Sequence, residues 1–144
     1  MHDSVLRISN KEDTVLGTGF VIHLDEGGGY VATCGHVVND CGNSVFVEGK
    51  QSNIISNYYS DGLDLAVLYV KGLKYKAFKI TKKISRNSLV IGYSNLLGDS
   101  KREEISIVSI KSDIEICKKD SLRIKTLKLY PKEEISSGYS GSPV

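Results

Sequence analysis

The sequence has 144 residues, of which 40% are hydrophobic and 25% charged, and its formal net charge is +2. This composition is ordinary for a globular domain, or for two small halves that share a core, and the small net charge does not require an acidic partner. No run approaches the roughly 20 apolar residues of a membrane-spanning helix, so we expect no membrane span.

The start of the chain and its cysteines bear on where the protein works. The opening "MHDSVLRISNKEDTV" has no long apolar run behind a basic segment, so we expect no signal peptide. An odd number of cysteines (Cys34, Cys41 and Cys117) argues against a disulfide framework. Together these features predict a reducing compartment and a cytoplasmic location.

Short segments of alternating or continuous apolar residues, bounded by turn formers, predict many strands and little helix. The glycine-rich stretch Asp25–Gly29 is expected to be a hairpin turn whose consecutive glycines supply positive φ. Only residues 35–39 look helical, over a single turn. Strands at this spacing indicate a sandwich or barrel. The expected strands are 5–8, 14–24, 30–33, 44–47, 54–55, 65–70, 89–92, 104–110, 114–117 and 122–129.

A basic run occupies the middle of the chain. Lys71–Arg86 contains seven basic residues and no acidic one, and its later part is expected to bridge two β-rich halves, with a boundary near residues 81–88. We interpret the run as a solvated surface. Binding of nucleic acid or another anionic partner is the alternative, but only Tyr75 and Phe78 offer aromatic rings among the basic residues.

Three residues of the types needed for nucleophilic catalysis stand far apart in the sequence. His36 lies in "YVATCGHVV", Asp64 opens the apolar run "DLAVLYV", and Ser140 lies in "GYSGSPV". A serine hydroxyl needs a base to take its proton, histidine suits that task near neutral pH, and a carboxylate fixes the histidine tautomer. Taken singly, His36 is more often a structural histidine and Asp64 more often a strand-entry or turn aspartate, while Ser140 could equally be a turn serine.

The order and surroundings of these residues resemble the chymotrypsin-like serine peptidases, especially the bacterial HtrA-like branch. The shared motifs are "GTGFVI" (17–22), "TCGHVV" (33–38), "DLAVL" (64–68), "VIGYSN" (90–95) and "GYSGSPV" (138–144). The resemblance implies an all-β, chymotrypsin-like double β-barrel. The first barrel would span residues 1–80 and carry His36 and Asp64, and a partial second barrel would span 88–144 and carry Ser140.

The resemblance also implies residue roles in a serine endopeptidase that acts on protein or peptide substrates without a metal or organic cofactor. Ser140 would be the nucleophile, His36 the general base and Asp64 its orienting carboxylate. The backbone N–H groups of Gly138 and Ser140 would form the oxyanion hole.

The specificity pocket is less defined by the motifs. Glu134 stands six residues before Ser140, where trypsin-like members set the charge of the pocket, so a basic residue before the scissile bond is one expectation. Alternatively, Ile135 lines the pocket and Glu134 is solvated.

Three residues depart from the family pattern. Tyr139 stands where digestive members have an aspartate that pairs with a new N-terminus, so we expect no activation by N-terminal cleavage. Ser142 replaces a glycine. Cys34 replaces a small residue and is expected to pack as a small hydrophobe. Cys34, His36 and Cys41 have a loose metal-like spacing, but packing of both cysteines is favoured over a metal site.

In the family, strands that follow the serine loop form a wall of the specificity pocket, and this sequence stops soon after that loop. We therefore expect a fragment or effector domain of a larger regulated protein, for example in bacterial stress response or defence. Completion of the second barrel by a C-terminal region or a partner chain is a further possibility. The alternative function is a catalytically silent, protein-binding or regulatory module with the same fold.

Overall fold

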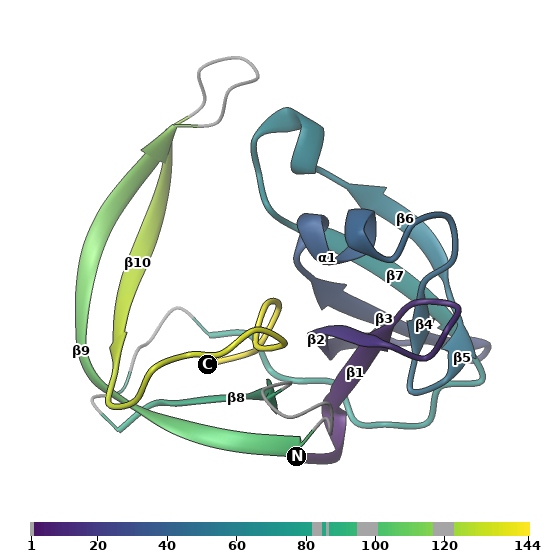
Figure 1. The fold of residues 1–144 in the computed structure, drawn as a ribbon, viewed down its shortest axis with the longest axis horizontal. Helices are drawn as coiled ribbons and strands as arrows, with labels where there is room; N and C mark the ends of the chain where they lie inside the picture. The colour runs from purple at the N-terminus through teal and green to yellow at the C-terminus, as the bar shows by residue number, and fades with distance from the viewer. Residues whose placement is uncertain (1, 82–84, 86, 95–100, 117–122) are drawn as a thin grey trace.

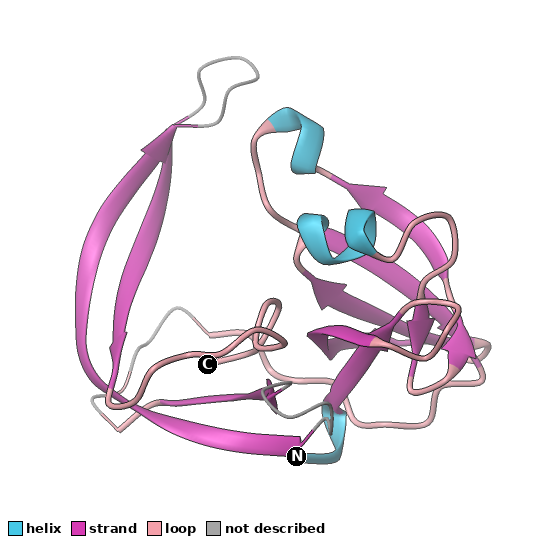
Figure 2. Ribbon diagram, viewed as in Figure 1, coloured by secondary structure: helices cyan, strands magenta, loops and turns pink. Residues whose placement is uncertain are grey.

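The computed structural model describes residues 2–81, 85, 87–94, 101–116 and 123–144. Within them, ten strands form one sheet of seven strands and one of three, with three short helical segments (Figures 1 and 2). None of the helices in these ranges is long and apolar enough to cross a membrane. The strands are β1 (Val5–Ser9), β2 (Val15–Leu24), β3 (Gly28–Thr33), β4 (Phe46–Val47), β5 (Lys50–Gln51), β6 (Asn53–Asn57), β7 (Ala66–Lys71), β8 (Leu89–Ser94), β9 (Lys101–Ile116) and β10 (Arg123–Pro131); the helical segments are η1 (His2–Ser4), α1 (Gly35–Asp40) and η2 (Tyr59–Asp61).

The first sheet forms a half-barrel in the order β5-β4-β1-β2-β3-β7-β6. One core cluster lies against it, in which Ile8, Val21, Val31, Leu68 and Val70 are completely buried. Each such side chain contributes about 1.5–3 kcal/mol relative to an exposed one. The mostly β architecture confirms the fold class predicted from the sequence.

The hairpin between β2 and β3 corrects one expectation. Gly27, Gly28 and Gly29 do not have positive φ. The turn is instead held by the side chain of Asp25, whose Oδ1 accepts hydrogen bonds from the N–H groups of Gly27 (2.9 Å) and Gly28 (2.8 Å). Gly28 is needed for a different reason, because a Cβ there would clash with the carbonyl oxygen of Val70 on the neighbouring strand β7.

The second sheet has the order β10-β9-β8, and Figure 1 shows β9 and β10 as a long, curved hairpin. Two separate strands were expected at 104–110 and 114–117, whereas β9 runs without interruption for 16 residues. The polar residues Lys111–Asp113 stay in the strand because they pair with Thr126–Lys128 of β10. The interruption was predicted from polarity alone, although a strand with a solvated face tolerates polar residues. Cys117 lies outside the described residues.

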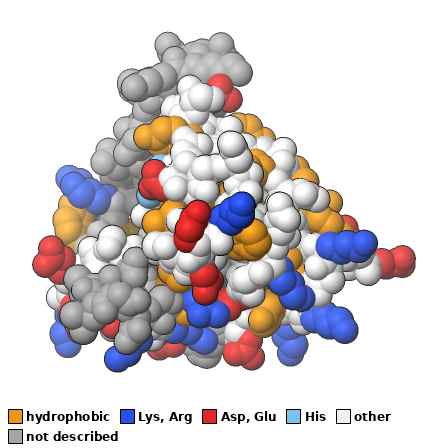
Figure 3. Space-filling model, turned by 45° about the vertical axis from the view of Figure 1, so that its right-hand side comes forward, with side chains coloured by type: hydrophobic (Ala, Val, Ile, Leu, Met, Phe, Trp, Pro, Cys, Tyr) orange, Lys and Arg blue, Asp and Glu red, His pale blue; other side chains and the backbone are white. Residues whose placement is uncertain are grey.

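The part of the basic run that the structure describes lies against the first sheet. The Phe78 ring meets Phe20 edge to face at 5.7 Å between centroids, and Tyr75 packs on the first core. Both aromatic rings are thus engaged within the protein, while Lys71, Lys74, Lys76 and Lys79 are exposed. Lys and Arg are interspersed with Asp and Glu on the face in Figure 3, which fits a solvated surface. Lys82, Lys83, Arg86 and half of the expected boundary at 81–88 lie outside the described residues.

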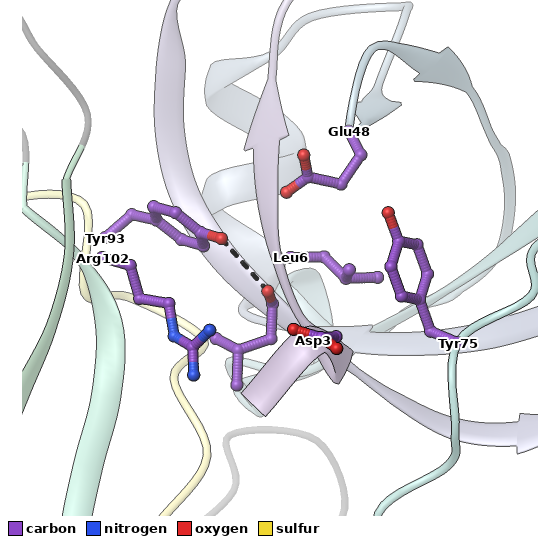
Figure 4. A pocket seen from close by; sticks show the side chains of 7 residues that line it. Asp3, Leu6, Glu48, Tyr75, Tyr93 and Arg102 are labelled. Carbon is purple, nitrogen blue, oxygen red and sulfur yellow. Dashed lines mark hydrogen bonds between the residues drawn. The ribbon is translucent and has the colours of Figure 1, made fainter. Parts of the chain in front are cut away.

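The two sheets meet at β1, β8 and β9, where an open pocket of about 190 Å³ lies (Figure 4). Tyr93 Oη on β8 donates a hydrogen bond to the carbonyl oxygen of Val5 on β1 (3.2 Å). The pocket shares no residue with the predicted site and belongs to the junction of the sheets. Its lining residues are Asp3, Val5, Leu6, Glu48, Tyr75, Tyr93 and Arg102.

Candidate active site

The topology of the first sheet brings His36 and Asp64 together. Strands β3 and β7 are antiparallel neighbours, and their last pair is Thr33 with Ala66. The chain leaves β3 through Cys34 into α1, whose first turn carries His36, and it enters β7 at Ala66, two residues after Asp64. Because antiparallel partners reach the same end of the sheet, residues 28 positions apart meet there.

His36 and Asp64 are joined by two hydrogen bonds. The backbone N–H of His36 donates to Asp64 Oδ1 at 2.8 Å, and His36 Nδ1 lies 2.6 Å from Asp64 Oδ2. The two side chains remain 36% and 45% exposed. The carboxylate therefore fixes both the start of α1 and the imidazole ring, which leaves Nε2 as the ring nitrogen not held by Asp64.

The surroundings of Asp64 favour its ionised form. Burial alone raises its pKa, but the two hydrogen bonds from His36, the His36 charge and the Cys34 thiol outweigh burial and hold the pKa below its usual value of 3.8. At neutral pH Asp64 is therefore a carboxylate that can orient a histidine and stabilise an imidazolium.

Cys34 takes part in this group rather than acting only as a packing residue. It is half-buried against the first core, and its sulfur lies within 4.8 Å of a carboxylate oxygen of Asp64. Burial and the Asp64 charge raise its pKa to about 11, so the group is a protonated thiol at neutral pH. Cys41 is buried at the end of α1 and is not part of the cluster formed by Cys34, His36 and Asp64.

The loop that carries Ser140 is attached to the first sheet by Thr18 on β2. The Thr18 N–H donates to the carbonyl oxygen of Ser140 at 2.8 Å, and Thr18 Oγ1 donates to the carbonyl oxygen of Gly138 at 2.7 Å. Thr18 Oγ1 also accepts from the Tyr93 N–H on β8 at 3.0 Å. One fully buried side chain thus connects β2, β8 and the serine loop.

The glycines of the serine loop set its course. Gly138 and Gly141 have φ of +101° and +88°, in the region that favours glycine. A Cβ at Gly141 would clash with the Thr18 carbonyl oxygen and Thr33 Oγ1. In the described part of the chain, the N–H groups of Gly138, Tyr139 and Ser140 donate to no acceptor.

Tyr139 and Ser142 hold the loop against the second sheet. Tyr139 is 4% exposed in a core with Val90, Ile105 and Ile107, and its hydroxyl donates to Glu103 Oε2 at 3.0 Å. Burial and the Glu103 carboxylate raise the Tyr139 pKa. Ser142 Oγ is buried and has no hydrogen-bond partner among the described residues.

The remaining predicted positions are less connected. Glu134 and Ile135 lie in the exposed segment after β10, and Ile135 is 43% exposed. Within the described ranges, no hydrogen bond joins Ser140 Oγ to His36. The structure therefore joins His36 to Asp64 directly, and joins the Ser140 loop to them through Thr18, Thr33 and Cys34.

Sequence reasoning missed the residues that connect the loop to the first sheet. Thr18 and Thr33 each look like an ordinary β-strand threonine, and no local pattern marks the bond from Thr33 Oγ1 to the Thr18 carbonyl oxygen (2.7 Å). In the sequence, only the motifs "GTGFVI" (17–22) and "TCGHVV" (33–38), which contain these threonines, indicated that β2 and β3 lie near the site.

Comparison with known proteins points to one family. The model of the family described as "Trypsin-like peptidase domain" matches residues 17–144, which confirms the resemblance found in the motifs. No curated protein matches the sequence.

Solved structures of proteases share the fold. The active form of the Rv3671c protease from M. tuberculosis has a TM-score of 0.66 at 24% identity, over 97% of this chain and 63% of that chain. The serine endoprotease from Yersinia pestis has a TM-score of 0.58 at 19% identity, over 96% and 48% of the two chains. The human pathogenic astrovirus serine protease has a TM-score of 0.55 at 18% identity, over 99% of this chain and 75% of that chain. The chain thus spans less than two thirds of the length of the first two proteases.

Proposed function

The chain belongs to the family of trypsin-like peptidase domains, and from this premise we propose that it is a serine endopeptidase with Ser140, His36 and Asp64 as its catalytic triad. The observation that carries the proposal is the pair of hydrogen bonds from one residue of α1, His36, to the ionised carboxylate of Asp64. Such a pair fixes the tautomer in which His36 Nε2 accepts a proton.

The proposed reaction is acyl transfer through a covalent intermediate. Ser140 Oγ attacks the scissile carbonyl carbon while His36 Nε2 takes the hydroxyl proton. The resulting imidazolium then gives that proton to the leaving amine, and the C–N bond breaks. A water molecule, deprotonated by the same nitrogen, hydrolyses the acyl-enzyme and restores Ser140.

The oxyanion formed on the carbonyl oxygen is assigned to the N–H groups of Gly138 and Ser140. Two observations support this assignment. Both N–H groups lack an acceptor in the described part of the chain, and Thr18 holds their loop through a hydrogen bond to the Gly138 carbonyl oxygen. Loss of one donor in such a site costs about 3–4 kcal/mol of transition-state stabilisation.

The substrate is proposed to be a protein or peptide. Two residues of the chain lead to different expectations for the substrate residue that precedes the cleaved bond. Glu134 favours a basic residue before the cut, and Ile135 favours an apolar one. A peptide pair that differs only at that residue separates the two, because Glu134→Gln would erase a preference for lysine or arginine and leave an apolar preference unchanged.

A silent binding module of the same fold is the second candidate. It is favoured by the lack of a hydrogen bond between Ser140 Oγ and His36 among the described residues.

The test is hydrolysis of an unstructured protein and of a fluorogenic peptide library by the natural full-length protein and by its Ser140→Ala variant. Peptidase action predicts cleavage that the variant loses by at least about a thousand-fold. Equal rates for the two proteins would refute the triad. Tight binding of the same peptides without turnover would favour the silent module.

A further inference from the structure

The junction of β3, α1 and β7 gathers three side chains of the kinds that bind transition metals. Cys34 Sγ, one ring nitrogen of His36 and one carboxylate oxygen of Asp64 all lie within 4.8 Å of one another. The sequence pattern directed attention to Cys41 as the third ligand, but Asp64 takes that place. We propose that Cys34, His36 and Asp64 form a Zn²⁺ site and that the bound ion switches the peptidase off.

The donor set matches the coordination chemistry of zinc. Zn²⁺ accepts thiolate sulfur at about 2.3 Å, imidazole nitrogen at about 2.0–2.1 Å and carboxylate oxygen at about 2.0–2.2 Å, commonly in tetrahedral geometry. Such bonds place neighbouring ligand atoms roughly 3.3–3.6 Å apart. The three donor atoms lie within 4.8 Å of one another, close to this spacing. His36 Nδ1 and Asp64 Oδ2 are 2.6 Å apart, so their hydrogen bond must open for both to bind the ion.

Charge and access also fit a zinc ion. A thiolate and a carboxylate supply two negative charges, which balance the ion, while the imidazole binds as a neutral ligand. Asp64 and His36 are partly exposed, so an ion can enter from solvent and keep a water molecule as its fourth ligand.

The local backbone holds the ligands in position before any ion arrives. Cys34 is the extended residue that precedes α1, and the His36 N–H is bonded to Asp64 Oδ1. Preorganised ligands reduce the ordering that binding requires.

Zinc binding and peptidase action exclude each other, and this part of the inference rests on the proposed function. The Cys34 thiol releases its proton to solvent when its sulfur binds the ion. His36 Nδ1, which faces Asp64, binds the ion in the unprotonated form, so the single proton of the neutral ring moves to Nε2 through solvent. Nε2 then carries a proton and cannot accept one from Ser140, and Asp64 no longer orients the ring.

Metal binding is tested with a probe that does not depend on activity. In a protein whose only thiol is Cys34 (Cys41→Ala with Cys117→Ala), Co²⁺ is titrated under anaerobic conditions, and Zn²⁺ then displaces it. The expected result is a thiolate-to-cobalt charge-transfer band that saturates at one equivalent. Replacement of Cys34 by alanine in that background should remove the band and weaken Zn²⁺ binding by at least about 100-fold. Loss of a residue that only supports a metal ligand already lowers metal affinity by up to about 100-fold, and loss of a direct ligand should lower it at least as much.

The first control is the double variant itself, whose thermal unfolding and Zn²⁺ affinity should match those of the natural protein. The second is Asp64→Asn, which keeps the thiol and should weaken Zn²⁺ binding. A Cys34-only protein without the charge-transfer band, or a Cys34→Ala variant with unchanged Zn²⁺ affinity, would overturn the site.

The switching half has its own readout. Zn²⁺ should suppress fluorophosphonate labelling of the natural protein with a midpoint at the Zn²⁺ Kd that is obtained from cobalt displacement after correction for the competing Co²⁺. Labelling of Cys34→Ala, whatever its level, should be insensitive to Zn²⁺. If the natural protein is not labelled even with a chelator present, that result contradicts both the proposed peptidase function and its inhibition by zinc. The cobalt spectrum still tests the metal site independently. If labelling persists at saturating Zn²⁺, the switch alone falls.

Discussion

The backbone N–H of Thr18 donates a hydrogen bond to the carbonyl oxygen of Ser140 at 2.8 Å. This contact joins residues 122 positions apart (140 − 18) and fixes the serine loop to the sheet that also positions His36 and Asp64. The side chain of the same residue supports the bond, because Thr18 Oγ1 donates to the Gly138 carbonyl oxygen and accepts from the Tyr93 N–H.

Removal of the Thr18 hydroxyl should loosen the serine loop. Thr18→Val keeps the shape of the buried side chain but leaves the Gly138 carbonyl and the Tyr93 N–H without this partner. We expect a loss of about 1–3 kcal/mol in the free energy of unfolding, measured by chemical denaturation.

The peptidase activity of Thr18→Val should fall by up to about 100-fold, because displacement of the nucleophile by about 1 Å lowers the rate by that factor. Thr18→Ser is the matched control, since it retains the hydroxyl, and it should keep the activity within a few-fold. Equal activities of the valine and serine variants would contradict the role of this hydroxyl.

The strands were predictable because their apolar residues alternate or run continuously between turn formers. The half-barrel with Val31 and Leu68 at its centre follows from this pattern. The length of β9 was not predictable in the same way, because Lys111–Asp113 are held in the strand by partners on β10 rather than by their own propensities.

The candidate site was predictable only in part. His36, Asp64 and Ser140 were found through motifs that resemble a known family, and the register of β3 and β7 accounts for the meeting of the first two. Cys34 packs against the first core as expected, but its approach to Asp64 could not be predicted from the sequence, because that approach depends on the pairing of β3 with β7. The residues next to Thr18 in the sequence do not indicate that this strand threonine binds the Ser140 loop.

Asp64→Asn should impair the peptidase and leave the fold intact. The amide cannot stabilise an imidazolium and favours the wrong histidine tautomer, so we expect kcat to fall by about 10⁴-fold. Measurement of kcat and KM separately tests this, since KM should change little. A fall in kcat below ten-fold would contradict the orienting role of Asp64.

The same variant tests the pH dependence of stability. The pKa of Asp64 is lower in the folded protein than its usual 3.8, so its stabilising contribution is present above that value and is lost as the pH falls through the folded pKa. Between about pH 5 and about pH 3, the free energy of unfolding should therefore fall more steeply for the natural protein than for Asp64→Asn. Parallel pH profiles would indicate that the His36–Asp64 bonds contribute nothing.

Tyr139 should contribute mainly through burial. Tyr139→Phe removes only the bond to Glu103 and should cost about 0.5–1.5 kcal/mol in the free energy of unfolding. Tyr139→Ala empties a buried ring site in the core with Val90 and Ile105, and should cost about 3–5 kcal/mol. Similar losses for the two variants in denaturant unfolding would show that the hydroxyl, not the ring, holds the loop.

Ser142 offers a stabilising substitution. Its buried hydroxyl has no partner in the described part of the chain, so Ser142→Ala removes a desolvated polar group without adding backbone freedom. We expect a gain of about 1 kcal/mol in the free energy of unfolding. Ser142→Gly is the comparison, since the flexibility of glycine should offset the gain by about 0.5–1 kcal/mol. A loss of stability in the alanine variant would mean that the hydroxyl has a partner in solution.

The most direct test of the triad is covalent labelling of the natural full-length protein with a fluorophosphonate probe, with the modified residue located by mass spectrometry. A serine reacts rapidly with this probe only when a histidine accepts its proton. If Ser140, His36 and Asp64 form a triad, Ser140 is modified, and the modification disappears in Ser140→Ala and in His36→Ala and is strongly slowed in Asp64→Asn. Labelling at Ser140 that is equally fast in His36→Ala, or no labelling of the natural protein with a chelator present, would contradict it.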